Sequence, residues 1–278
     1  MKELETILEK ENYDFKVIEQ ISDGETSQIF LGEFNNIKSI FKLSKENKFK
    51  LIINEYLKNG IIQKIDTKNI SPKVLFHDLH SKLIIYEYFE KCSSDKQFNN
   101  FYQLGKKLKE LHEIRSNKKI KTFEDQFNLY LNASSSELDN KYIKDAVDLF
   151  NELNVGKENY VLSHNDLNSS NVMFKNNKIV FIDFEYLSIN SRYCDLSKLI
   201  SSLQMNETEI NIFLNSYGIK NLNNSIYTKL KKWTLMNIYT EFLWANFMNR
   251  KRNNHFNEKY INNLKKKIKQ QRQQLELI

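Results

Sequence analysis

The sequence predicts an α+β fold in which two lobes enclose a cleft. Segments rich in β-branched and aromatic residues, with turn residues between them, dominate residues 1–90, which predicts a small antiparallel sheet. From Phe101 onward apolar residues recur at helical spacing, so residues 91–278 are expected to form a larger, mainly helical lobe. A short hairpin between Tyr160 and Ile182 interrupts the helical pattern. The chain has 278 residues, of which 40% are hydrophobic, and this is enough for both lobes.

The predicted sheet begins with three strands, at residues 15–21, 28–32 and 38–43. The turn at residues 22–27 holds small and hydroxylated side chains, and its backbone N–H groups could bind phosphate. An ordinary hairpin turn accounts for the same composition, because the turn contains only one glycine. The candidate phosphate-binding residues of this turn are Gly24, Thr26 and Ser27.

A lysine of the third strand is a second candidate for phosphate binding. Lys42 lies between apolar residues and should project from a half-buried strand. Lys38 lies on the same face by strand alternation, so either lysine fits the role. A helix is expected over residues 49–59, and its Glu55 is the candidate ion-pair partner of Lys42, with a solvent-facing glutamate as the alternative. A further strand at residues 82–89 should lead into the linker between the lobes.

Helical periodicity predicts most of the second lobe. The first helix, at residues 101–111, is followed by His112, for which a structural role is a better interpretation than a catalytic one. The remaining helices are expected at residues 123–131, 142–153, 195–203, 207–216 and 226–249, and along a C-terminal stretch with apolar positions at Tyr260, Leu264, Ile268 and Leu275.

Composition excludes several classes of function. The net charge of +7 is spread along the chain and is densest at Lys265–Lys269, where a solvated helix face is expected rather than a nucleic-acid site. No run of eighteen apolar residues is present, which argues against a membrane span. The N-terminus lacks an apolar signal-peptide core, and Cys92 and Cys194 show no metal-type spacing. A cytoplasmic protein with reduced thiols is therefore expected.

The strongest functional signal is a set of polar residues around the hairpin. Residues 163–174 read SHNDLNSSNVMF, and residues 182–186 read IDFEY. Asp166 can accept a proton from a hydroxyl nucleophile, while Asn171 and Asp183 offer a neutral and a charged oxygen to magnesium. Phosphoryl transfer depends mainly on positioning and charge neutralisation, which these residues can supply. The spacing predicts a phosphoryl-transfer site that uses ATP and Mg²⁺, and an ordinary hairpin with polar turns is the weaker alternative.

These motifs resemble the choline/ethanolamine kinase family, in its bacterial choline kinase form. The resemblance rests on His164-Asn165-Asp166 with Asn171, on the IDFEY segment, and on the residues after it. The pair Glu185-Tyr186 is the most discriminating element, because aminoglycoside phosphotransferases of the same larger group more often lack it. The resemblance implies a protein-kinase-like fold and transfer of phosphate from ATP to a small amino alcohol, choline or ethanolamine. The residues that continue the match are Asn190, Arg192, Asp195 and Leu196.

The resemblance also implies where the two substrates bind. The linker backbone at Glu87 and Phe89 should hold adenine through main-chain groups. A quaternary ammonium cannot donate hydrogen bonds, so its recognition needs aromatic faces and nearby carboxylates. Trp244 and Phe247 match a pair of tryptophans in the family and lie on one helix face, although core packing explains them equally well. The acceptor-binding residues expected on this basis are Asn168, Glu185, Tyr186, Trp244 and Phe247.

Three departures from the family pattern leave the acceptor open. Phe247 replaces a tryptophan, residues 168–170 replace a more usual Pro-Gly segment, and Ser202 stands where many choline kinases have a glutamate. Ethanolamine or another small amino alcohol therefore fits as well as choline. Phosphorylation of thiamine or an aminoglycoside is the alternative within the enzyme class. A catalytically silent nucleotide-binding scaffold is the alternative from another class, and the complete set of Asp166, Asn171 and Asp183 argues against it.

Overall fold

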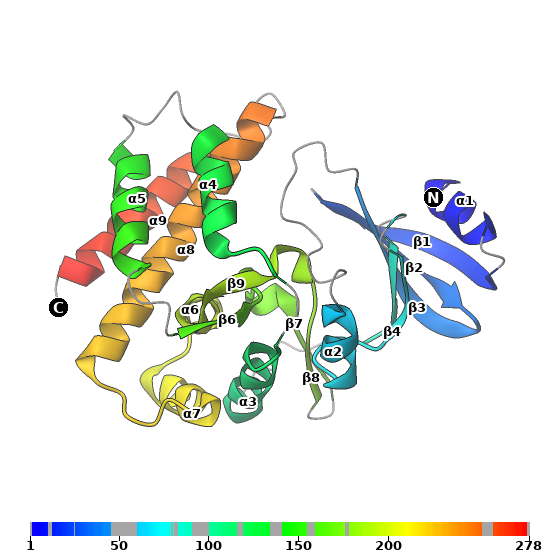
Figure 1. Ribbon diagram of the computed structural model, residues 1–278, viewed down its shortest axis with the longest axis horizontal. Helices are drawn as coiled ribbons and strands as arrows, with labels where there is room; N and C mark the ends of the chain where they lie inside the picture. The colour runs from blue at the N-terminus through cyan, green and yellow to red at the C-terminus, as the bar shows by residue number, and fades with distance from the viewer. Residues whose placement is uncertain are drawn as a thin grey trace.

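The computed structural model describes residues 2–10, 13–24, 26–45, 60–78, 80, 83–90, 100–115, 119–133, 141–154, 159–175, 178–251 and 258–276. A five-stranded antiparallel sheet forms one end of the molecule, and a mainly helical part forms the other (Figure 1). The strands of the sheet are β1 (Phe15–Asp23), β2 (Ser27–Phe34), β3 (Ile37–Ser44), β4 (Val74–Asp78) and β5 (Leu83–Glu87), in the order β1-β2-β3-β5-β4. The predicted helix at residues 49–59, with Glu55, lies outside the described residues.

Each face of the sheet has its own environment. The helix α1 (Lys2–Lys10) packs its buried Leu4 and Leu8 on the outer face, against an apolar cluster that includes Phe41 of β3. Figure 1 shows α1 on the side of the sheet away from the helical part. Because side chains alternate along a strand, Lys42 points to the opposite face, together with Ile40. The inner face of β3 thus presents a lysine toward the rest of the molecule.

The helical part is built around the long helix α8, which contacts α4, α5, α6 and α9. Its buried residues include Met236, Tyr239, Phe242 and Leu243. The helices are α2 (Ile61–Thr67), α3 (Phe101–His112), α4 (Phe123–Ala133), α5 (Lys141–Leu153), α6 (Arg192–Ser202), α7 (Glu207–Tyr217), α8 (Asn224–Lys251) and α9 (Glu258–Glu276). In the described part of the chain, no helix is long and apolar enough to cross a bilayer.

Two short antiparallel ladders hold the segments that carry the polar motifs. The hairpin of β7 (Val172–Lys175) and β8 (Lys178–Phe181) was predicted from the sequence. The other ladder pairs β6 (Tyr160–Ser163) with β9 (Ser188–Ser191), a strand that the sequence analysis did not anticipate. As a result, the start of the first motif and the end of the second are fixed to each other.

The sheet and the helical part also share apolar contacts. Ile84 of β5 and three isoleucines of α2 belong to the large cluster formed by the C-terminal helices. The division into lobes at residues 1–90 and 91–278 therefore stays a prediction about how the chain folds.

Candidate active site

A cleft of about 1130 Å³ lies between the inner face of the sheet and the helical part. Residues from β2, β3, the segment after β5, both polar motifs and helices α4, α6, α8 and α9 line it. The predicted site residues that line the cleft are Gly24, Thr26, Ser27, Lys42, Glu87, Phe89, Asp166, Asn168, Asp183, Glu185, Tyr186 and Trp244. The structure thus brings together residues that are far apart in the sequence.

The loop before Asp166 is anchored by the buried carboxylate of Asp195, in the first turn of α6. Its oxygens accept hydrogen bonds from the backbone N–H groups of His164 (2.7 Å) and Asn165 (2.9 Å) and from the Ser163 hydroxyl (2.8 Å). His112 adds a contact of 3.1 Å through Nε2, which supports its predicted structural role. Burial alone would raise the pKa of Asp195, but these donors, His112 first among them, lower it below its usual value.

Two residues in this region have a left-handed backbone that non-glycine residues seldom adopt. Asn165 has φ of 64° and Asp183 has φ of 68°. The side-chain nitrogen Nδ2 of Asn165 donates to the carbonyl oxygens of Ser163 (3.1 Å) and Tyr186 (2.9 Å) and to the Ser188 hydroxyl (2.8 Å). These bonds stabilise the strained turn and tie the two motifs together. Strain of this kind is concentrated at functional sites.

His164 connects the loop to the strand end that carries Asp183. Its Nε2 lies 2.8 Å from the Ile182 carbonyl oxygen, and its Nδ1 lies 3.3 Å from the Asp166 backbone nitrogen. Because a carbonyl oxygen only accepts, Nε2 carries the proton and Nδ1 is the acceptor. The histidine therefore fixes the separation between the Asp166 and Asp183 segments and does not itself reach the substrate side.

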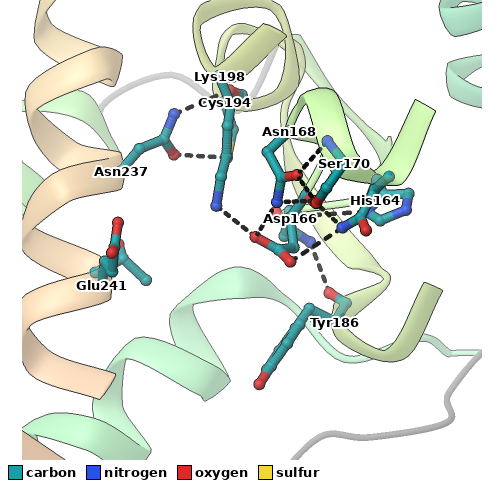
Figure 2. Close-up of polar contacts among 12 residues, drawn as sticks. His164, Asp166, Asn168, Ser170, Tyr186, Cys194, Lys198, Asn237 and Glu241 are labelled. Carbon is teal, nitrogen blue, oxygen red and sulfur yellow. Dashed lines mark hydrogen bonds and ion pairs between the residues drawn. The ribbon is translucent and has the colours of Figure 1, made fainter. Parts of the chain in front are cut away.

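The Asp166 carboxylate is held at both oxygens (Figure 2). Lys198 Nζ lies 2.6 Å from Oδ1, and Asn171 Nδ2 lies 3.2 Å from Oδ2. The same Asn171 nitrogen donates to the Asp166 carbonyl oxygen at 2.7 Å. Asn171 is buried and does not line the cleft, but its nitrogen faces Asp166, so its amide oxygen is the atom left for a cation.

On the sheet side, three charged groups meet in the cleft. Lys42 Nζ forms an ion pair with Asp183 and lies 3.4 Å from a Glu185 oxygen. The hydroxyl of Thr26 bonds both Glu185 oxygens, at 2.8 and 2.7 Å. Glu185 was predicted to bind the acceptor, but its carboxylate turns toward the sheet side of the cleft, where Lys42 and Thr26 are its polar partners.

The protonation states of these groups follow from their burial and charges. Burial lowers the pKa of Lys42, but the carboxylates of Asp183 and Glu185 outweigh this and raise it above its usual value. Burial raises the pKa of Asp183, yet Lys42 brings it below its usual value. The pKa of Glu185 is raised, first by burial and then by the neighbouring Asp183. A metal ion bound beside Lys42 would add positive charge and would therefore favour the ionised forms of Asp183 and Glu185.

Lys42 and Lys38 lie on the same face of β3 but have different partners, and only Lys42 contacts Asp183 and Glu185. Lys38 lies over the Tyr88 ring, with Nζ 4.0 Å from the ring centre.

The backbone of the linker between the sheet and the helical part offers a donor to the cleft. The Glu87 backbone N–H already donates to the Lys73 carbonyl oxygen at 2.8 Å. The amide of Phe89 is therefore the better linker donor for a ligand in the cleft.

The opposite half of the cleft has aromatic walls. Tyr186, Trp244, Tyr130 and Tyr260 line it, and the Tyr260 hydroxyl donates to Glu241 at 2.6 Å. Phe247, expected to join Trp244, instead lies in the core at 1% exposure and packs on Tyr130, with the ring centres 5.4 Å apart. Core packing accounts for Phe247, whereas Trp244 is partly buried, packs against the same core cluster and also lines the cleft.

Sequence reasoning missed two charged residues of this half. Lys198 follows the anchored Asp195 by three positions, and Glu241 precedes Trp244 by three, so helical spacing places each on the same face as a site residue. That spacing was the available signal. No residue pattern indicated that α6 and α8 would bring the two side chains to one cleft.

The residues present fit a magnesium-bound nucleotide. Among the described residues, no group of three or more His, Cys, Asp or Glu side chains could hold a metal alone. Asp183, Glu185 and the Asn171 amide oxygen supply a partial set of hard oxygen donors, and magnesium commonly completes such a set with phosphate oxygens and water. Lys42 adds a fixed positive charge for the phosphates.

Comparison with known proteins connects this site to a family. The model of the phosphotransferase enzyme family matches residues 83–228. A protein LicA homolog of Mycoplasma capricolum is 28% identical over 153 residues, covering 53% of this chain and 61% of the relative. A protein LicA homolog of Metamycoplasma hominis is 34% identical over 126 residues, covering 41% of this chain and 47% of the relative. The chain thus aligns with less than two thirds of each of these curated relatives.

Solved structures extend the likeness to the whole fold. The choline kinase LicA of Streptococcus pneumoniae has a TM-score of 0.75 at 17% identity, covering 100% of both chains. LicA in complex with AMP has a TM-score of 0.74 at 18% identity, covering 97% of this chain and 96% of that one. A spectinomycin phosphotransferase in complex with ADP and spectinomycin has a TM-score of 0.62 at 17% identity, covering 95% and 93%. The predicted α+β, protein-kinase-like fold is confirmed.

Proposed function

This chain belongs to the phosphotransferase enzyme family, and from that premise we propose that it transfers the γ-phosphoryl group of ATP to the hydroxyl of a small amino alcohol, choline or ethanolamine. The observation that carries the proposal is the placement of Asp166 between two unlike halves of one cleft. One half holds Lys42, Asp183 and Glu185, and the other holds Tyr186 and Trp244. The first half suits phosphates with their cation, and the second suits an organic cation.

In this proposal Asp166 accepts the proton of the acceptor hydroxyl as its oxygen attacks the γ-phosphorus. The bond from that phosphorus to the bridging oxygen breaks, and ADP leaves with the bond electrons. Lys42 binds the phosphates, and the backbone around Gly24 and Ser27 encloses them. Asn171, Asp183 and Glu185 would hold magnesium, which neutralises phosphate charge when bound.

Asp166 is well prepared for this role because its position is fixed before any substrate binds. Contacts from Lys198 and Asn171 fix its carboxylate, and the bonds of Asn165 and Asp195 fix its backbone. A base held in place contributes to the rate through orientation as well as proton transfer. We place the reaction in the cytoplasm, where the thiol of the buried Cys194 stays reduced.

An acceptor screen tests the proposed function. The full chain is incubated with magnesium, ATP and one of choline, ethanolamine, thiamine or kanamycin, and phosphorylated product is measured. We expect turnover with choline or ethanolamine and none with kanamycin. In Asp166→Asn the rate should fall roughly 100- to 10,000-fold, with ATP binding retained. Turnover of kanamycin or thiamine alone would replace the amino alcohol, and a near-normal rate of Asp166→Asn would refute the assigned base.

A further inference from the structure

Two charged side chains lie on either side of the acceptor half of the cleft: Lys198, which holds the Asp166 carboxylate, and Glu241, which has no role in the proposed reaction. Lys198 extends from α6 toward Asp166, and Glu241 projects from α8 (Figure 2). Among the described residues that line this half, the charged ones are Asp166, Lys198, Glu241 and Lys267. The sum of these four charges determines how much positive charge an acceptor can carry into the cleft.

Lys198 has little freedom to leave its partner. Asp195, three residues earlier on α6, is fixed to the backbone of the Asp166 loop, so the helix and the loop move together. The side chain of Lys198 is 21% exposed, and its Nζ lies 2.6 Å from Asp166 Oδ1. Burial lowers the pKa of Lys198, but the Asp166 charge reverses this and raises it, so the lysine is protonated at neutral pH.

The pairing leaves Glu241 as the remaining negative charge. The hydrogen bond to Glu241 comes from the neutral hydroxyl of Tyr260, at 2.6 Å, and the charge of Glu241 also acts on Lys198 more weakly than that of Asp166. Lys267 is exposed, so water and salt screen its charge. Tyr186 and Trp244 line the same half and add aromatic surface. One half-buried carboxylate beside aromatic rings matches one ammonium group.

We propose that Glu241 is the specificity-determining carboxylate of this site, and that Lys198 cancels the charge of Asp166, so that the cleft selects acceptors with a single positive charge. The inference rests on the proposed function and deepens it. A neutral alcohol leaves Glu241 half buried without a counter-ion. An acceptor with a second ammonium group near the hydroxyl meets the fixed charge of Lys198.

The first test compares choline with 3,3-dimethylbutanol, its neutral isostere, in wild type and Glu241→Gln. The variant should raise the KM for choline by about 10- to 100-fold, because a contact with a charged group is lost. The KM values for the isostere and for ATP should stay within about 2-fold, as expected for a contact that only the cation makes. Glu207→Gln on α7 makes the same charge change at an exposed position outside the cleft and should alter none of these values. An unchanged choline KM in a folded Glu241→Gln enzyme overturns the inference.

The second test changes Lys198 and measures the ratio of kcat/KM for choline to that for the isostere. Lys198→Met removes the charge that balances Asp166, so this ratio should rise several-fold even though kcat falls. Lys198→Arg should restore the wild-type ratio. A purely structural lysine would lower the rate with both alcohols and leave the ratio unchanged, and that result counts against the inference.

A third test needs no substitution and holds even if the variants fold poorly. In mildly acidic buffer, where both amines of N-(2-hydroxyethyl)ethylenediamine are protonated, wild-type enzyme should prefer ethanolamine, with one charge, over this dication by at least about 10-fold in kcat/KM. Equal use of the two contradicts the single-charge rule. If wild type phosphorylates neither choline nor ethanolamine, the proposed function itself fails. If it phosphorylates them without charge discrimination, only the present inference fails.

Discussion

At the scale of single residues, the site is defined by how each charge is balanced. Asp166 has Lys198, Asp183 has Lys42, and Asp195 has a set of neutral donors together with His112. Burying an ionised group is costly unless it is paired and hydrogen bonded, and each of these carboxylates meets that condition. Removing one member of a pair should therefore leave its partner as an unpaired buried charge, which lowers stability or alters ligand binding at that position.

Asp183→Ala should abolish magnesium-dependent binding of ATP. Asp183 provides one of the two charged oxygens of the expected metal set, and Glu185, which Thr26 and Lys42 hold, together with the neutral Asn171 cannot replace it. Titration of the variant with ATP in the presence and absence of magnesium measures the effect. An ATP affinity that still rises with magnesium as in wild type would place the metal elsewhere.

Trp244→Ala and Phe247→Ala should have opposite consequences. Trp244 lines the cleft, so its loss should raise the acceptor KM roughly 2- to 30-fold, the equivalent of one cation–π contact of about 0.5–2 kcal/mol. Phe247 is 1% exposed, so its loss should cost about 3–5 kcal/mol of folding free energy.

Steady-state kinetics and urea unfolding of both variants separate the two roles. If Trp244→Ala unfolds easily but keeps its acceptor KM, Trp244 is a core residue. If Phe247→Ala is stable and shifts the acceptor KM, the assignments are reversed.

At the scale of elements, the segments that carry the two polar motifs are positioned by helices that pack closely against them. Helix α3 supplies His112 to Asp195, and α3 packs against α7. Gly105 of α3 allows this approach, since a Cβ atom there would lie 2.0 Å from the Ser216 hydroxyl oxygen and 2.4 Å from the Phe213 carbonyl oxygen. The orientation of His112 thus depends on a glycine that has no chemical role.

Gly105→Ala should lower the free energy of unfolding by about 1–3 kcal/mol, the usual cost of overpacking. Alanine favours helix formation by about 1 kcal/mol over glycine, so the steric effect must exceed that gain. Gln103→Ala on the exposed face of α3 is the matched control and should change stability by less than about 0.5 kcal/mol. Urea unfolding measures both, and a stabilised Gly105→Ala protein would show that α3 and α7 can separate at little cost.

At the scale of the whole molecule, the cleft joins a sheet and a helical part that approach it from different sides. Lys42 lies on β3 and Thr26 directly before β2, and their partner Glu185 lies between β8 and β9, so these contacts join the sheet to the second polar motif. Asp195 connects α6, α3 and the loop within the helical part. The same charged groups therefore contribute both to the stability of the fold and to the geometry of the site.

Asp195 should make the folded protein sensitive to acid. Its pKa in the folded state is below the ordinary value, so the ionised form adds stability at neutral pH. That stability is fully present above the unfolded-state pKa of about 4 and is lost as the pH falls through the lower folded-state pKa. Asp195→Asn should be less stable at neutral pH and should lose less stability between about pH 5 and pH 2 than wild type. Urea unfolding across this range is the measurement, and parallel curves for the two proteins would contradict it.

The sequence by itself determined the fold class, most elements and the order of the candidate catalytic groups. Local rules were sufficient there, because hydrophobic periodicity shows which residues a strand or helix buries. The spacing of Asp166, Asn171 and Asp183 within one hairpin unit is likewise local, and the structure places all three in one region. The short strand β9 and helix α2 were missed because partners distant in the sequence stabilise them.

Only the tertiary structure decided which side of the cleft each polar group faces. Glu185 follows Asp183 by two residues, yet its orientation depends on Thr26 and Lys42, more than 140 positions earlier in the chain. Lys42 differs from Lys38 in its contacts with Asp183 and Glu185, and Trp244 differs from Phe247 in its burial. Helices α6 and α8 bring Lys198 and Glu241 to one cleft. These are long-range contacts, and a pattern with a period of two or 3.6 residues carries no information about them.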